Sequence, residues 1–97
     1  MEHKLKNNNS KILETDILHI RDRLIEETVE PTSFCLIIHP SKEQDLLDIL
    51  HSYCSKPIFK SISNIFDMPV YKDEKCPPNK IHILPELEYQ NMRKTLL

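Results

Sequence analysis

Cysteine and histidine are the residues of this chain with the widest chemical use, and two pairs of them have a spacing that resembles a zinc pattern. Cys35 precedes His39 by four positions, and His51 precedes Cys54 by three. On one helix face His51 and Cys54 could chelate. On a strand, however, Cys35 and His39 would lie about 13 Å apart at about 3.3 Å per residue. Zinc holds its ligands at about 2.0–2.3 Å, so we predict no four-ligand metal site, and binding by His51 and Cys54 stays open.

Nucleophilic catalysis would need an exposed thiol near a histidine that acts as its base. Cys76, in a loop before two prolines, is the thiol we expect to be exposed, and His82 follows on the next strand. An incidental loop cysteine is the favoured explanation of Cys76. The chain has no glycine, which excludes the glycine-rich loops that bind phosphates and the serine nucleophile elbow. We therefore expect no catalytic centre and no cofactor, with an enzyme built on Cys76 and His82 as the remaining option.

Charge is distributed unevenly along the 97 residues, although the net charge is only −2. Residues 12–54 have three basic and nine acidic side chains, whereas the segments before and after each have a net charge of +2. Solvent-exposed helix faces would explain the acidic excess. A polarised surface that attracts a basic partner or another copy of the chain would also explain it. The basic residues are few and interrupted by acids, so nucleic acid is not the expected partner.

Two amphipathic helices are predicted in the first half of the chain. Apolar residues repeat at helical spacing over residues 11–29, with Ser10 as the expected N-cap. Ser41 and Gln44 fit a capping box at the start of a second helix, whose expected buried stripe ends at Tyr53 and Cys54. Residues 1–10 are expected to form a flexible basic tail.

The strands are predicted from shorter patterns. Residues 33–39 are apolar on both faces, which predicts a central strand that is covered on both sides. Residues 66–71 and 81–84 are expected to pair as a long-looped hairpin, with an edge strand at Pro69. A short terminal helix over residues 86–97 would place Leu87 and Met92 inward. The sequence thus predicts an α+β fold for residues 11–97: one domain with two helices on a small sheet and a C-terminal β-hairpin.

The expected compartment is the cytoplasm. No segment resembles a signal peptide, and no apolar stretch approaches the roughly 20 residues of a membrane helix. Three cysteines in a short chain are typical of free thiols in a reducing environment. A membrane partner is therefore not expected.

Residues 30–85 have an ordered series of motifs that can be compared with known families. The run E-P-T-S-F-C-L-I-I-H is followed by Pro40 and a helix, then by I-F-D-M-P-V-Y-K-D, a proline-containing loop and I-H-I-L. This order resembles small accessory proteins that tailed phages encode, and is similar to part of their major capsid proteins. Asp67 stands where that pattern usually has glycine. The resemblance implies a phage or prophage protein that acts by binding.

The function that we predict from the sequence is a non-enzymatic protein-interaction module that binds and modulates a host protein or defence complex. The alternatives are a self-assembling structural protein of virion type, with homo-oligomers, and a nucleic-acid-associated regulator. The predicted partner contacts lie on the hairpin loop and on the acidic second helix: Tyr71, Lys72, Asp73, Glu74, Lys75, Glu43, Asp45 and Asp48.

Overall fold

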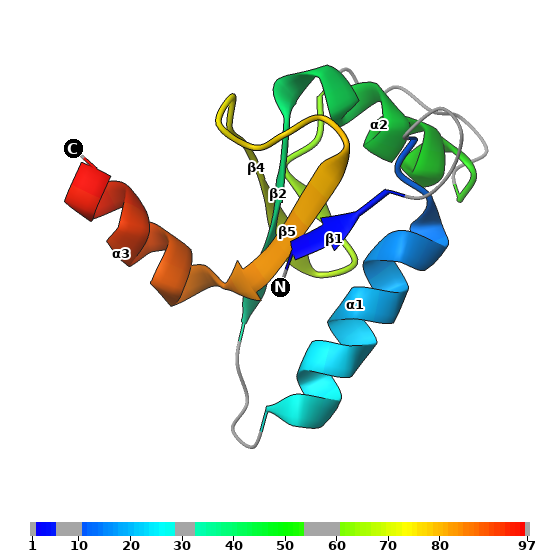
Figure 1. The fold of residues 1–97 in the computed structure, drawn as a ribbon. Helices are drawn as coiled ribbons and strands as arrows, with labels where there is room; N and C mark the ends of the chain where they lie inside the picture. Colours follow the sequence, from blue (N-terminus) through cyan, green and yellow to red (C-terminus); the bar gives the residue numbers. More distant parts are fainter. Residues whose placement is uncertain (1, 6–10, 29–32, 54–60, 97) are drawn as a thin grey trace.

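The computed structural model describes residues 2–5, 11–28, 33–53 and 61–96 and has the predicted α+β architecture (Figure 1). Side chains are described for all of these except residues 2, 3 and 93–96. The elements follow one another as β1 (Glu2–Lys4), α1 (Glu14–Glu27), β2 (Phe34–Ile38), the 3₁₀ turn η1 (Pro40–Lys42), α2 (Glu43–His51), β3 (Asn64–Ile65), β4 (Met68–Lys72), β5 (Lys80–Pro85) and α3 (Glu86–Leu96).

The strands form one mixed sheet in the order β1-β5-β2-β4-β3. β2 is parallel to β4, with Leu36 opposite Val70, and antiparallel to β5, with Leu36 opposite Ile83. β4 and β5 are consecutive and run in opposite directions, as the expected hairpin requires. They do not pair with each other, because β2 lies between them and pairs with one edge of each.

The central position of β2 follows from its composition. All five of its residues are apolar and all five are buried, which confirms the prediction of a strand covered on both faces. Phe34, Leu36 and Ile38 belong to the larger core cluster, whereas Cys35 and Ile37 belong to a smaller cluster on the opposite face.

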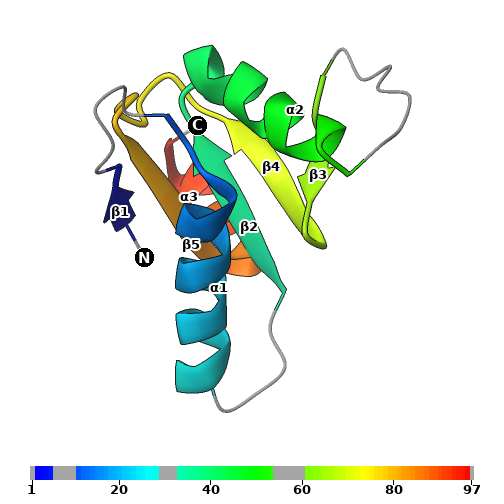
Figure 2. The same ribbon diagram turned by 90° about the vertical axis from the view of Figure 1, so that its right-hand side faces the viewer.

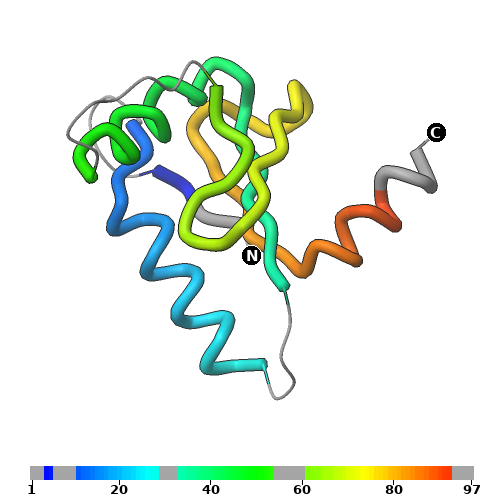
Figure 3. The backbone as a smooth tube through the Cα atoms, turned by 180° about the vertical axis from the view of Figure 1, so that it is seen from behind, coloured from blue at the N-terminus to red at the C-terminus, as the bar shows by residue number. Residues whose placement is uncertain are grey.

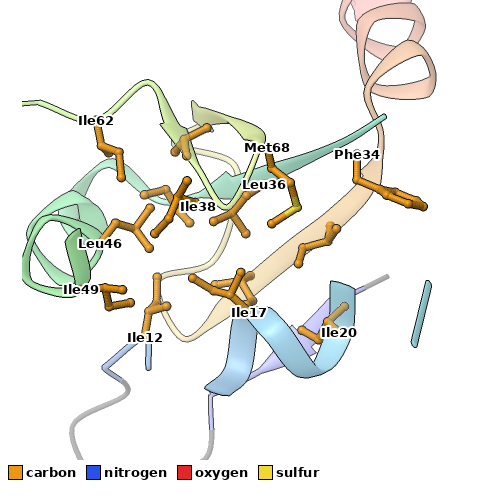
Figure 4. Close-up of a cluster of buried hydrophobic side chains, with 14 of the residues drawn as sticks. Ile12, Ile17, Ile20, Phe34, Leu36, Ile38, Leu46, Ile49, Ile62 and Met68 are labelled. Atoms are coloured by element: carbon orange, nitrogen blue, oxygen red, sulfur yellow. The ribbon is translucent and has the colours of Figure 1, made fainter. Parts of the chain in front are cut away.

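The helices divide between the two faces of the sheet. α1 and α2 cover one face and α3 lies on the other (Figures 1 and 2). Figure 4 shows the larger core, where Ile17 and Ile20 of α1 and Leu46 of α2 point toward Leu36 and Ile38 of β2. None of the helices in the described part of the chain has the length and apolar character needed to cross a membrane.

Residues 2–4 correct the expectation of a flexible tail over residues 1–10. They form β1, which pairs antiparallel with β5. Leu5 then donates its backbone N–H to Asn79 O at 2.8 Å, and its side chain is buried. Charged residues such as Lys4 are common on edge strands, so a basic composition did not exclude a strand here. The remaining tail residues, 1 and 6–10, lie outside the described residues.

The predicted capping box at Ser41 and Gln44 is wrong. Pro40 takes the first position of the helical turn, where its missing N–H costs nothing, so the preceding His39 becomes the cap. His39 Nδ1 accepts a hydrogen bond from Ser41 N–H at 3.1 Å. The Gln44 amide instead donates to Asp48 Oδ1 at 2.9 Å.

The predicted helix ends also shift. α1 begins at Glu14, where Asp16 Oδ2 accepts the N–H of Leu13 at 2.9 Å, and the predicted cap Ser10 lies outside the described residues. α2 ends at His51, so Tyr53 leaves the buried stripe and is 60% exposed. Cys54, the other end of that stripe, lies outside the described residues.

A tight turn at residues 66 and 67 joins β3 to β4. Phe66 has φ 49° and Asp67 has φ 63°, the left-handed values that a two-residue hairpin turn of type I′ requires. Glycine normally supplies this conformation, and the chain has none. Arg21 of α1 donates to Phe66 O at 3.2 Å, and its guanidinium carbon lies 5.9 Å from the centre of the Phe66 ring. These contacts hold the turn against the larger core.

Candidate functional site

Glu43, the first predicted contact residue on α2, links that helix to the sheet. Its Oε2 accepts a hydrogen bond from Lys72 Nζ at 2.7 Å and from the backbone N–H of Ile62 at 3.2 Å. The hydrogen bond from the Lys72 ammonium, and secondarily that from Ile62, lowers the pKa of the Glu43 carboxyl. Glu43 and Lys72, which were both predicted as partner contacts, therefore contact each other within the chain.

Asp45 and Asp48 attach the segment before α1 to α2. Asp45 Oδ2 accepts the backbone N–H of Ile12 at 3.0 Å, and the Ile12 side chain is fully buried. Asp48 forms an ion pair with Lys11 at 3.7 Å. These acids join elements of the fold, and their role as partner contacts stays a prediction.

Tyr71 lies on the opposite side of the sheet from Lys72, because successive side chains of a strand point to opposite faces. The Tyr71 hydroxyl donates to Glu86 Oε1 at 2.9 Å and accepts from Gln90 Nε2 at 2.8 Å. The centres of the Tyr71 and Tyr89 rings are 4.9 Å apart. The hydrogen bond to Glu86 is the main cause that raises the pKa of Tyr71. The predicted contact residues are thus divided between the two faces of the sheet.

The loop after β4 is built around Asp73. Its N–H donates to Ile38 O at 2.9 Å, and its Oδ1 accepts the N–H of Lys75 at 2.9 Å. Glu74 and Lys75 are exposed. These hydrogen bonds fold the loop back over the end of β2, on the side of α3.

Cys76 is buried, at 5% exposure, which corrects the expectation of an exposed thiol. The loop folds back onto the sheet, and the Cys76 Sγ lies 3.8 Å from Ile37 O and 3.6 Å from Lys80 O. A buried cysteine that has carbonyl acceptors for its S–H acts as a small apolar residue with a structural role. Cys76, the nucleophile of the enzyme alternative, is therefore part of the smaller core cluster.

Cys35 is the second thiol of this cluster and is fully buried. Burial, together with the negative charge of Glu86, raises the pKa of Cys35 to about 11. Its thiol stays protonated at neutral pH and is a poor nucleophile there. His39, its partner in the zinc-like spacing, serves as the cap of η1. Among the described residues, no three His, Cys, Asp or Glu side chains are grouped to hold a metal ion.

A cavity of about 160 Å³ lies between α3, the sheet and the loop after β4, and we call it the α3 hollow. Its floor comes from β2 and β5, and its walls come from the loop and from α3. The residues that line it are Ile37, Asp73, Lys75, Cys76, His82, Leu84, Tyr89 and Met92. The hollow is a feature of the described surface that can receive a group from another molecule.

The sequence predicted part of the lining of the α3 hollow. Asp73 and Lys75 were predicted as partner contacts, and Cys76 and His82 were the residues of the enzyme alternative, whereas the other four lining residues were not predicted as site residues.

The expected terminal helix is confirmed, but the prediction that Leu87 and Met92 lie inward is wrong, because Leu87 is 73% exposed and Met92 is 50% exposed. Tyr89 is the buried residue of that helix, at 7% exposure. The sequence contained one signal for a helix on this face of the sheet. Residues 34–38 are apolar on both faces, and the face that α1 and α2 leave open must be covered by another element.

Comparison with known proteins gives no match: no family model fits the chain, and no curated protein or solved structure is significantly similar to it.

Proposed function

We propose that this protein is a non-enzymatic interaction module that binds a protein partner by taking one of the partner's apolar side chains into the α3 hollow. The observation that carries the proposal is the hollow itself. It combines an apolar floor at Ile37 and Leu84 with Met92, which is half exposed at 50%. Apolar pockets that receive a single anchor side chain are typical centres of protein interfaces.

The volume of the hollow favours a protein partner over a metabolite. Sites for cofactors and drug-sized ligands occupy about 300–1,000 Å³. The hollow has about 160 Å³, close to the roughly 150 Å³ of an engineered cavity that binds benzene. One leucine, methionine or phenylalanine side chain is the group that fits this space.

The charge at the hollow favours an acidic residue beside the anchor side chain. Lys75 is exposed and contributes to the lining, whereas the Asp73 carboxylate accepts the backbone N–H of Lys75. The ammonium of Lys75 is thus available to an approaching carboxylate. Such a rim contact contributes more to orientation and association rate than to affinity.

The source and compartment in the proposal come from the sequence. The resemblance of residues 30–85 to tailed-phage proteins supports a phage or prophage accessory protein whose partner is a host protein or defence complex. Free thiols support a cytoplasmic location.

The test compares two matched substitutions in α3. Met92→Glu places a charge in the lining of the hollow, and Leu87→Glu places the same charge on a more exposed residue outside that lining. Tagged wild-type and variant proteins would be used to capture partners from lysate of the source organism or its host, with circular dichroism to verify folding. We expect Met92→Glu to reduce capture of the wild-type partner at least tenfold and Leu87→Glu to preserve it.

Other outcomes of this experiment decide against the proposal. Equal capture by both variants would show that the hollow is not the docking site. Wild-type protein that elutes above the mass of one chain without a foreign partner, and that Met92→Glu converts to single chains, would support the self-assembling alternative.

A further inference from the structure

α3 is attached to the sheet through its first turns. Its first residue, Glu86, donates its N–H to Ser33 O at 2.9 Å and accepts the Tyr71 hydroxyl. Gln90 donates to the same hydroxyl. Of the α3 side chains that the structure describes, residues 86–92, Tyr89 is the buried one. From this anchor the helix extends away from the sheet (Figures 1 and 3).

The two faces of the sheet are buried to very different extents. The larger core, under α1 and α2, contains 16 buried residues among those described. The smaller cluster contains four among the described residues, namely Cys35, Ile37, Cys76 and Tyr89, and of the described side chains of α3 only Tyr89 belongs to it. Elements with little buried apolar area open locally at a lower free energy than the whole domain unfolds.

We propose that α3 is a hinged cover, which undocks from the Cys35–Ile37 face of the sheet as one unit while the other elements stay folded. The hinge is the junction of β5 and α3, where the helix begins directly after Pro85. Undocking removes Tyr89 and Met92, the α3 part of the lining, and turns the hollow into an open apolar face at Ile37 and Leu84. Opening of α3 changes the access of a partner only if the partner docks at the hollow, and this part of the inference rests on the proposed function.

Cys35 reports the opening of the covered face. It is fully buried and does not line the α3 hollow, so its alkylation requires the face to open. Cys76, which lines the hollow and is 5% exposed, is the second thiol that is followed. Val70→Cys supplies a matched reporter, since Val70 lies in the neighbouring strand but belongs to the larger core.

The experiment measures the rate at which iodoacetamide labels each cysteine in a Cys54→Ser background, between zero and about 1 M urea, by mass spectrometry of peptides. We expect the labelling rates of Cys35 and Cys76 to be nearly independent of urea over this range. After each rate is divided by that of an unfolded peptide standard, the cysteine of Val70→Cys should be labelled more slowly than Cys35 and Cys76. Its labelling rate should rise with urea as global unfolding does. Tyr71→Phe removes the hydroxyl bonded to Glu86 and Gln90, and should raise the Cys35 labelling rate about tenfold.

The inference is overturned if all three cysteines, each compared with its peptide standard, share one rate and one dependence on urea, since that result assigns their labelling to global unfolding. An unchanged Cys35 rate in Tyr71→Phe would also contradict it. The experiment contains no partner, so its failure leaves docking in the hollow standing. If the capture experiment with Met92→Glu and Leu87→Glu contradicted docking in the hollow, a measured opening of α3 would likewise remain valid.

Discussion

Replacement of Asp45 by alanine tests whether the acidic residues of α2 serve the fold. The Asp45 carboxylate accepts the backbone N–H of Ile12 at 3.0 Å, next to a side chain that is fully buried. Alanine leaves that N–H without this acceptor. A buried donor that loses its acceptor costs about 1–3 kcal/mol, and hydrogen bonds to charged groups contribute about 1.5–3 kcal/mol.

We expect Asp45→Ala to lower the free energy of unfolding by about 2 kcal/mol. The higher helix propensity of alanine and the loss of a favourable acid in the first turn of α2 are each worth less than about 1 kcal/mol and oppose each other. For a domain of this length, about 2 kcal/mol corresponds to a fall in Tm of about 8–16 °C. Asp45→Asn retains an acceptor oxygen and should lose about half as much.

Urea unfolding followed by circular dichroism at pH 7 measures this loss as a lower midpoint with an unchanged slope. Glu74→Ala is the matched control, because Glu74 is an exposed carboxylate on the loop after β4. It should stay within about 0.5 kcal/mol of wild type. If Asp45→Ala and Glu74→Ala unfold at the same urea concentration, the structural role of Asp45 is refuted and its predicted role as a partner contact gains support.

Three further substitutions test other contacts of the fold. Glu43 has a lowered pKa in the folded state, so its contribution is present above the unfolded value of about 4.3 and is lost as pH falls. The stability difference between wild type and Glu43→Gln, followed by urea unfolding at several pH values, should therefore shrink below about pH 4; a constant difference would contradict this linkage. Arg21→Met removes the hydrogen bond and ring contact at Phe66 and should cost about 1–2 kcal/mol in the same assay. His39→Ala removes the cap on Ser41 N–H and should lower Tm by about 4–8 °C in a thermal melt; an unchanged Tm would refute the cap.

The sequence by itself determined the class of the fold and its central strand. Residues 34–38 are apolar at every position, and only burial on both faces accommodates such a strand. Apolar residues at helical spacing likewise predicted α1 and α2. These are local properties, because the period of the apolar residues matches either a helix or a strand whatever the rest of the chain does.

Only the tertiary structure decided how the strands are ordered and what the polar residues do. β4 and β5 could have paired with each other, and no pattern in the sequence shows that β2 lies between them. Asp45 has the sequence pattern of a solvent-exposed helix residue, yet its acceptor role depends on Ile12, 33 positions earlier. Cys76 is buried because its loop folds back onto Ile37, 39 positions away. Such contacts join segments far apart in the chain, so no local pattern of residues records them, and the α3 hollow exists only after they have formed.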